Sequence, residues 1–184
     1  MELTDWELVL QCQGGDRDAF QELALRYHQR IFLMIVGLIG NREDALEVTQ
    51  EVFFRAYRKI KTFQGGASFY TWLYRIALNL AIDSQRRQKR TPLDFRDDMD
   101  GIFESQNEVA KDPFWDVQAR ELREKLFSAI GDLTPEHKAV IMLRTLEGLS
   151  YRDIGEILGC SEGTVMSRLH YARKKLHEKL NGLL

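Results

Sequence analysis

The chain has 184 residues, of which 44% are hydrophobic and 10% aromatic, and its formal net charge is −2. This length fits one domain or two small ones, and this apolar content excludes a globally disordered chain. Cys12 and Cys160 lie far apart, and the four histidines have no zinc-ligand spacing, so we expect reduced thiols in a cytoplasmic protein and no metal site. The acidic N-terminus has no signal-peptide core, and the apolar run 31–39 is too short to span a bilayer.

Charge is segregated along the chain. Residues 1–51 hold four bases and ten acids, for a net charge of −6. Residues 75–90 and residues 163–180 each hold five bases and one acid, for a net charge of +4. This pattern indicates an acidic surface for a protein partner and two basic surfaces for nucleic acid, although a merely solvated basic helix face would give the same count.

Caps and breakers divide the first 60 residues into three predicted helices. Thr4 or Asp5 caps the first, and two glycines at 14 and 15 end it. Asp16 starts a longer helix that ends at Gly40, and a third helix is predicted over residues 42–59. The positions expected to face inward are Trp6, Val9, Leu10, Phe20, Leu23, Ala24, Tyr27, Ile31, Ile35, Ala45, Val48, Val52, Phe53, Ala56 and Tyr57.

Polar residues occupy the other face of the third predicted helix. Such a face is usually only solvated, and a surface for a protein partner is the alternative. The residues concerned are Asp44, Glu47, Gln50, Glu51 and Arg55.

Aromatic and basic residues are interleaved in the next segment. A loop with two glycines spans residues 61–68, and Ser68 caps a fourth predicted helix. Its broad apolar face is Phe69, Trp72, Leu73, Ile76, Ala77, Leu80 and Ile82, and the positions elsewhere around it are Tyr70, Thr71, Tyr74, Asn79, Asp83, Arg86 and Arg87. Rings that stack on bases and cations that hold the backbone suit single-stranded nucleic acid, whereas the alternative is that Trp72 and Tyr74 are core or near-core residues.

The composition changes after residue 90. Residues 91–112 hold two bases and seven acids, for a net charge of −5, and this composition is typical of a flexible linker. Pro113 starts a helix to about Ile130, and Thr134 caps another that begins with Pro135. The sequence therefore predicts an all-α protein with two small helical domains, over residues 1–90 and 113–184, joined by the linker 91–112.

Residues 149–179 have the pattern of a helix-turn-helix. Ser150 and Asp153 form a capping pair, Gly159 ends a short helix, and Ser161 caps a basic second helix. In this motif the N-terminal part of the second helix enters the DNA major groove. Its inward positions are Val165, Leu169, Ala172 and Leu176, and its outward positions are Thr164, Ser167, Arg168, Tyr171 and Lys174.

Three stretches in this order resemble a bacterial sigma factor of the extracytoplasmic-function (ECF) group of the sigma-70 family, and are similar to its sigma-E-like members. DALEVTQEVFFRAYRKIKTF looks like the helix that binds core RNA polymerase, and GGASFYTWLYRIALNLAIDSQRR looks like the promoter-melting segment. LTPEHKAVIMLRTLEGLSYRDIGEILGCSEGTVMSRLHYARKKL looks like the reader of the upstream promoter element. The resemblance covers nearly the whole chain except the linker.

The resemblance implies a stress-response transcription factor that joins core RNA polymerase through its β′ clamp helices and β flap. Its first domain would read and open the −10 element, its second would read the −35 element as duplex, and an anti-sigma factor would silence it. The polymerase-binding residues implied are Asp44, Glu47, Gln50, Glu51 and Arg55. Those implied at the −10 element are Lys61, Phe63, Gln64, Ser68, Tyr70, Trp72, Asn79, Asp83, Arg86 and Arg87. Those implied at the −35 element are Thr164, Ser167, Arg168, His170, Tyr171, Arg173 and Lys174.

One departure and one alternative accompany the resemblance. Met166 stands where the family usually has Lys or Arg, which removes one expected DNA contact. The alternative is a stand-alone helix-turn-helix regulator that binds DNA as a dimer. Nothing resembles a hydrolytic or transfer site, and the acidic residues 94–100 lack the spacing of a calcium loop, so we expect neither an enzyme nor a cofactor.

Overall fold

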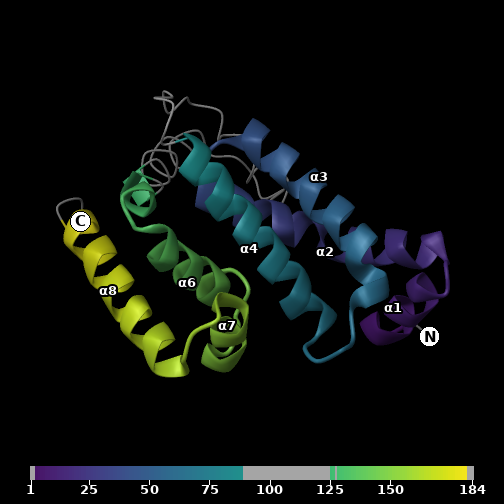
Figure 1. Cartoon of the computed structure of the whole chain (residues 1–184). Coiled ribbons are helices and arrows are strands. Elements are labelled where there is room, and N and C mark those ends of the chain that lie inside the picture. Colours follow the sequence, from purple (N-terminus) through teal and green to yellow (C-terminus); the bar gives the residue numbers. More distant parts are fainter. Residues whose placement is uncertain (1–2, 89–124, 127, 182–184) are drawn as a thin grey trace, which may run out of the picture.

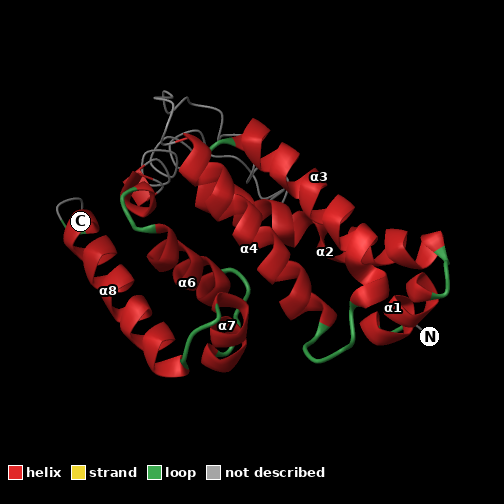
Figure 2. Cartoon of the chain, in the orientation of Figure 1, coloured by secondary structure: helices red, strands yellow, loops and turns green. Residues whose placement is uncertain are grey.

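The computed structural model describes residues 3–88, 125–126 and 128–181, and every regular element within these ranges is a helix (Figure 2). The all-α prediction is confirmed for this part of the chain. The expected linker at 91–112 and the expected helix start at Pro113 lie outside the described residues.

Local capping sets the starts of the N-terminal helices. Helix α1 (Asp5–Gln13) begins with a capping box between Thr4 and Glu7, and α2 (Arg17–Ile39) begins at the Asp16 cap. Helix α3 (Arg42–Lys59) and the short 3₁₀ helix η1 (Ile60–Thr62) follow. Helix α4 (Phe69–Gln88) begins where the Thr71 backbone N–H donates to the Ser68 hydroxyl at 3.1 Å. The predicted boundaries of α1, α2 and α3 and the predicted start of α4 are confirmed, whereas the predicted end of α4 at Arg90 lies outside the described residues.

Helices α2, α3 and α4 pack on one another, and α1 lies at one end of this bundle (Figure 1). The prediction that Trp6, Leu10 and Tyr57 face inward is wrong, because these side chains are 46%, 49% and 43% exposed. Helix α1 buries a narrow stripe with Leu8 and Val9, since it meets the bundle on one side only. Position 6 is therefore left at the surface.

The C-terminal helices form the predicted helix-turn-helix. Helix α6 (Pro135–Thr145) begins at the Thr134 cap, and α7 (Tyr151–Leu158) begins at Ser150. Gly159 ends α7 with a left-handed φ of 64°, which glycine adopts without steric cost. Helix α8 (Glu162–Leu180) begins at the Ser161 cap.

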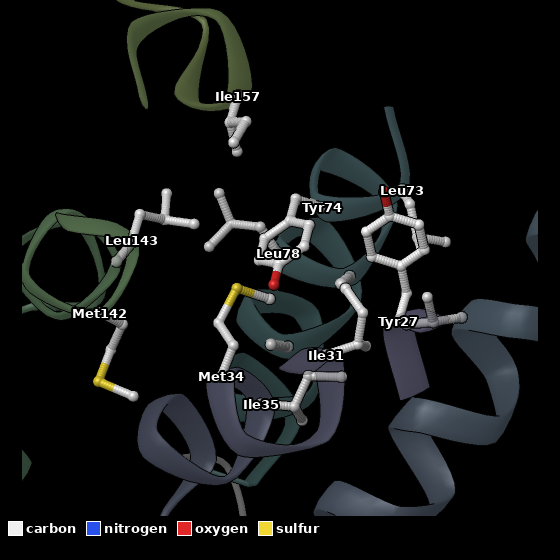
Figure 3. Close-up of a cluster of buried hydrophobic side chains, with 14 of the residues drawn as sticks. Tyr27, Ile31, Met34, Ile35, Leu73, Tyr74, Leu78, Met142, Leu143 and Ile157 are labelled. Carbon is white, nitrogen blue, oxygen red and sulfur yellow. The ribbon is translucent and has the colours of Figure 1, made fainter. Parts of the chain in front are cut away.

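The N-terminal and C-terminal helices share one core. Helices α2 and α4 lie against α6 and α7 along an interface that we call the seam (Figure 1). Figure 3 shows Met34 of α2 and Leu78 of α4 on one side of the seam, and Leu143 of α6 and Ile157 of α7 on the other. At Gly37 of α2 the Met142 side chain packs directly on the backbone, since a Cβ there would stand 1.9 Å from Cε of Met142.

Polar contacts also cross the seam. Arg30 forms an ion pair of 2.8 Å with Glu147, whose side chain is 4% exposed, and the Arg75 guanidinium donates to the backbone carbonyl of Glu156. Tyr74 is fully buried there, which confirms the alternative that it is a core residue, although it falls outside the apolar face expected from the spacing within its helix. The prediction that Thr71 lies away from the packed face is wrong, because this side chain is also buried. The C-terminal helices cover the side of α4 that carries Tyr74, and the spacing within α4 gives no sign of this.

Candidate nucleic-acid interface

Helix α8 presents a polar and basic face on the side away from the core. Val165, Leu169 and Ala172 are buried, which turns the opposite side of the helix outward. Ser167, His170, Tyr171, Arg173 and Lys174 are all exposed, and Tyr171 is 61% exposed. Hydroxyl, imidazole and cationic groups along one helix face can hydrogen-bond base edges and phosphates in a major groove.

Two residues of this predicted face are partly withdrawn from solvent. Thr164 is half-buried, and its hydroxyl lies 2.9 Å from that of Ser161 at the start of the helix. Arg168 is half-buried, and its guanidinium lies 3.7 Å from Sγ of Cys160. Met166, by contrast, is 52% exposed. An apolar side chain therefore stands among the outward groups of the first two turns.

The turn between α7 and α8 depends on a second glycine that the sequence reading missed. A Cβ at Gly155 would lie 2.7 Å from the backbone oxygen of Cys160. Only glycine allows α7 to approach the turn this closely. A glycine inside a helical pattern is itself the signal for such an approach.

Helix α4 carries the second basic face. Asn79, Asp83, Arg86 and Arg87 are exposed, and Arg87 donates to the backbone carbonyl of Asp83 at 3.4 Å. These residues recur every three or four positions and so share one side of the helix. They form the exposed C-terminal part of the predicted −10 surface.

The aromatic residues at the start of α4 form a packed cluster. The ring centroid of Phe63 lies 5.0 Å from that of Trp72 and 6.2 Å from that of Phe69. Phe63 is buried, so the expectation that it contacts DNA does not hold in this arrangement. Its ring packs under the loop against Phe69 and Trp72 instead. Tyr70 is half-buried beside Tyr74 at the seam, and both hydroxyls are enclosed without a hydrogen bond to the described residues. Burial, followed by the charge of Glu147, raises the pKa of both phenols.

The loop between η1 and α4 is open to solvent. Lys61, Gln64 and Ser68 are exposed, and Gly65 has a left-handed φ of 73°. A pocket of about 430 Å³ lies between this loop and the start of α1. Its walls include Trp6, Gly65, Ser68 and Phe69. The sequence reading placed the loop at a DNA surface but gave no role to α1.

Helix α3 presents a mixed polar and apolar surface. Glu47, Gln50 and Arg55 are exposed, and Arg55 Nε donates to Glu51 at 2.6 Å. Asp44, the first residue of the predicted set, is half-buried at the Asn41 cap, and its backbone N–H donates to the Asn41 side chain at 3.0 Å. The sequence reading missed two exposed apolar residues of this helix, Leu46 and Phe54, which are 38% and 55% exposed. Both positions could have been noticed in the sequence, because each is apolar but lies outside the set of residues expected to face the core. Exposed apolar residues that occur together mark protein interfaces.

Neither the buried thiol of Cys12 nor the length and polarity of the described helices indicates a further function. Burial raises the pKa of the Cys12 thiol, so this group is a poor nucleophile. Among the helices of the described ranges, none combines the length and apolar character that a membrane crossing requires.

A helix-turn-helix with a basic reading helix, together with a bundle that carries an aromatic and basic helix, defines a two-part DNA-binding transcription protein. Residues 23–91 match the family described as Sigma-70 region 2, and residues 123–176 match Sigma-70, region 4. An ECF RNA polymerase sigma-E factor of Haemophilus influenzae is 38% identical over 187 residues, which cover 100% of this chain and 98% of that protein. The chain therefore belongs to the ECF group of sigma-70 RNA polymerase sigma factors.

Solved structures agree with this assignment. CnrH in complex with the cytosolic domain of CnrY is 24% identical, with a TM-score of 0.73 over 98% of this chain and 99% of that one, and this likeness shows the fold. The sigma factor RpoE of Bartonella quintana, in complex with the anti-sigma factor NepR, is 25% identical, with a TM-score of 0.65 over 88% of this chain and 96% of that one. The alternative of a stand-alone dimeric regulator has no support among these relatives.

Proposed function

We propose that this chain brings core RNA polymerase to promoters by using three separate surfaces. Residues 1–90 form the domain that binds polymerase and opens the −10 element, and residues 113–184 form the domain that reads the −35 element. Residues 91–112 connect the two. The polymerase supplies the chemistry of RNA synthesis, and the chain itself is not an enzyme.

The outward face of α8 reads the −35 duplex. Most basic and polar groups of this face are exposed, as duplex recognition by a helix in the major groove requires, and only Thr164 and Arg168 are half-buried. Arg168 is placed near the start of the helix, where the side chains of this motif reach base edges. The residues assigned are Thr164, Ser167, Arg168, His170, Tyr171, Arg173 and Lys174.

The loop and helix α4 bind the −10 element. Extruding a base costs unstacking energy, which a pocket and a cationic backbone site can offset. The pocket beside Gly65 would hold the extruded nucleobase, and the exposed guanidinium groups of Arg86 and Arg87 would bind the phosphate backbone. The residues assigned are Lys61, Gln64, Ser68, Tyr70, Trp72, Asn79, Asp83, Arg86 and Arg87, with Phe63 supporting the loop.

The exposed face of α3 binds polymerase. Polar residues at its rim and the apolar Leu46 and Phe54 are the mixture that protein interfaces use. The guanidinium of Arg58 lies 5.6 Å from the Phe54 ring centroid and extends this surface. The polar residues assigned are Asp44, Glu47, Gln50, Glu51 and Arg55, which face the β′ clamp helices, while the C-terminal domain meets the β flap.

An anti-sigma factor controls the chain in the cytoplasm. The support is that a related RpoE was solved in complex with the anti-sigma factor NepR. A partner of this kind acts by covering the polymerase-binding and DNA-binding surfaces at once.

The observation that carries the proposal is the basic outward face of α8 on a helix whose other side is buried. The test is transcription in vitro with core polymerase free of other sigma factors. The chain should give transcripts that begin at defined positions, and a variant with Arg168 and Arg173 replaced by Ala should lose those that depend on the −35 element. Arg152→Ala, which removes an exposed basic side chain of α7, is the matched control. Specific binding of promoter duplex by the chain alone, with no effect on polymerase, would contradict the proposal.

A further inference from the structure

Helix α1 lies outside the part of the chain that matches sigma-70 region 2, because that match begins at residue 23. The helix nevertheless makes close contacts with the loop between η1 and α4. These contacts are on the side of the loop that holds the pocket.

Two residues of α1 contact the loop. The side-chain amide of Gln13 donates to the backbone carbonyls of Ile60 at 2.9 Å and Phe63 at 2.7 Å, which fixes the start of the loop. The six-membered part of the Trp6 ring lies against Gly65, where a Cβ would stand 2.8 Å from two ring carbons. The same ring meets Phe63 edge-on at a centroid distance of 6.2 Å.

The start of α1 is itself held rigidly. Asp5 accepts a hydrogen bond from the Tyr27 hydroxyl and pairs with Arg26 at 3.1 Å, so α2 fixes its position. Thr4 and Glu7 close the capping box. The wall that α1 offers to the pocket is therefore preformed.

Trp6 remains 46% exposed although it is the largest side chain of the helix. One part of the ring packs on the loop, and the ring also lines the pocket of about 430 Å³ beside Thr4, Ser68 and Phe69. This volume falls in the range of pockets that hold small ligands, of about 300–1,000 Å³. An exposed, braced indole at the wall of such a pocket is a stacking surface for a planar group.

We propose that α1 forms the second wall of the pocket and that the Trp6 ring stacks on a base extruded from the −10 strand. This inference rests on the proposed function, since it requires that the loop captures a base. Gln13 positions the loop without lining the pocket. Trp6 both braces the loop and contacts the base.

The test uses holoenzyme assembled from core polymerase and the full chain. Fork-junction DNA with a random single-stranded −10 tail is first selected with the wild-type holoenzyme. Each position of the selected tail is then replaced by an abasic nucleotide. With the intact tail, Trp6→Ala should weaken binding roughly 5- to 150-fold, the range of one base–aromatic stack. At one position the abasic substitution should weaken wild-type binding and leave Trp6→Ala unaffected.

Three variants separate stacking from support. Trp6→Phe keeps a ring and should retain the abasic sensitivity in part. Gln13→Ala should lower affinity and keep the sensitivity, because the stacking surface remains. Leu10→Ala removes another exposed apolar residue of α1, 49% exposed and outside the pocket walls, and should match wild type. Thermal melting of each chain checks that it is folded.

The outcomes distinguish this inference from the proposed function. If wild-type holoenzyme selects a −10 sequence but Trp6→Ala shows the same abasic profile as wild type, the stacking role is overturned and the function stands. If Trp6→Ala weakens binding to core polymerase as much as to DNA, the ring contacts polymerase, and the inference is equally overturned. If wild-type holoenzyme selects no sequence, the proposed function itself fails.

Discussion

The ion pair across the seam should respond unequally to the loss of its two members. The Arg30 side chain is 49% exposed, whereas that of Glu147 is 4% exposed. Arg30→Ala leaves a carboxylate enclosed by protein without its partner. Glu147→Ala leaves a guanidinium that water already reaches. We therefore expect Arg30→Ala to destabilise the chain more.

The magnitudes follow from the exposures. Breaking a fully buried pair costs about 3–5 kcal/mol, and because water reaches one end of this pair we expect about 2–3 kcal/mol for Arg30→Ala. Glu147→Ala should cost about 1 kcal/mol, as for a surface pair. Arg55→Ala is the matched control, since its partner Glu51 is also exposed, and it should cost about 0.5 kcal/mol or less.

Thermal unfolding of the free chain, followed by circular dichroism, measures the difference. At this chain length each kcal/mol lowers the Tm by roughly 2–4 °C, so Arg30→Ala should lower it by about 4–12 °C. Equal losses for Arg30→Ala and Glu147→Ala would refute the reasoning from unequal solvation. So would a larger loss for the glutamate variant.

Three further predictions concern the turn and the two partner surfaces. Gly155→Ala places a Cβ 2.7 Å from a backbone oxygen and should cost about 1–3 kcal/mol in urea unfolding, whereas Gly163→Ala, with its nearest atom at 3.9 Å, should cost nothing; similar losses would disprove the steric argument. Arg168→Ala should weaken holoenzyme binding to the −35 element by about 1–3 kcal/mol and relax specificity at one base pair, and uniform weakening across all −35 variants would indicate a phosphate contact instead. Glu51→Lys should weaken binding to core polymerase in a pull-down titration at unchanged Tm, and unchanged affinity would remove α3 from the interface.

Helix boundaries could be predicted because they depend on neighbours in the sequence. Thr4, Asp16, Ser150 and Ser161 each cap the helix that follows, as expected. A side-chain hydroxyl or carboxylate reaches backbone N–H groups two or three residues away, so no information from elsewhere in the chain is needed.

Burial that arises between distant segments could not be predicted in this way. For Tyr74 the sequence left a nucleic-acid role and a core position both open, and what decides between them is that helices more than 60 residues later in the chain enclose it. Trp6 was expected inward, yet its helix has neighbours on one side only. The same holds for the candidate site. The outward polar residues of α8 could be predicted from the helical periodicity of its sequence. The pocket wall formed by α1 could not, because it depends on a contact between residues more than 50 positions apart.

The seam has a consequence for the reach of the chain. The nominal positions −10 and −35 differ by about 25 base pairs, or roughly 85 Å at 3.4 Å per base pair. With α4 packed on α7 and α7 packed on α8, the two helices that the proposed function assigns to DNA stay within one small body and cannot span that length. If both helices contact DNA as proposed, the halves must part, which uncovers Tyr70 and breaks the hydrogen bond from Arg75 to the backbone carbonyl of Glu156. The free energy of parting is subtracted from that of binding, so each substitution that weakens the seam should raise the apparent affinity for polymerase and promoter.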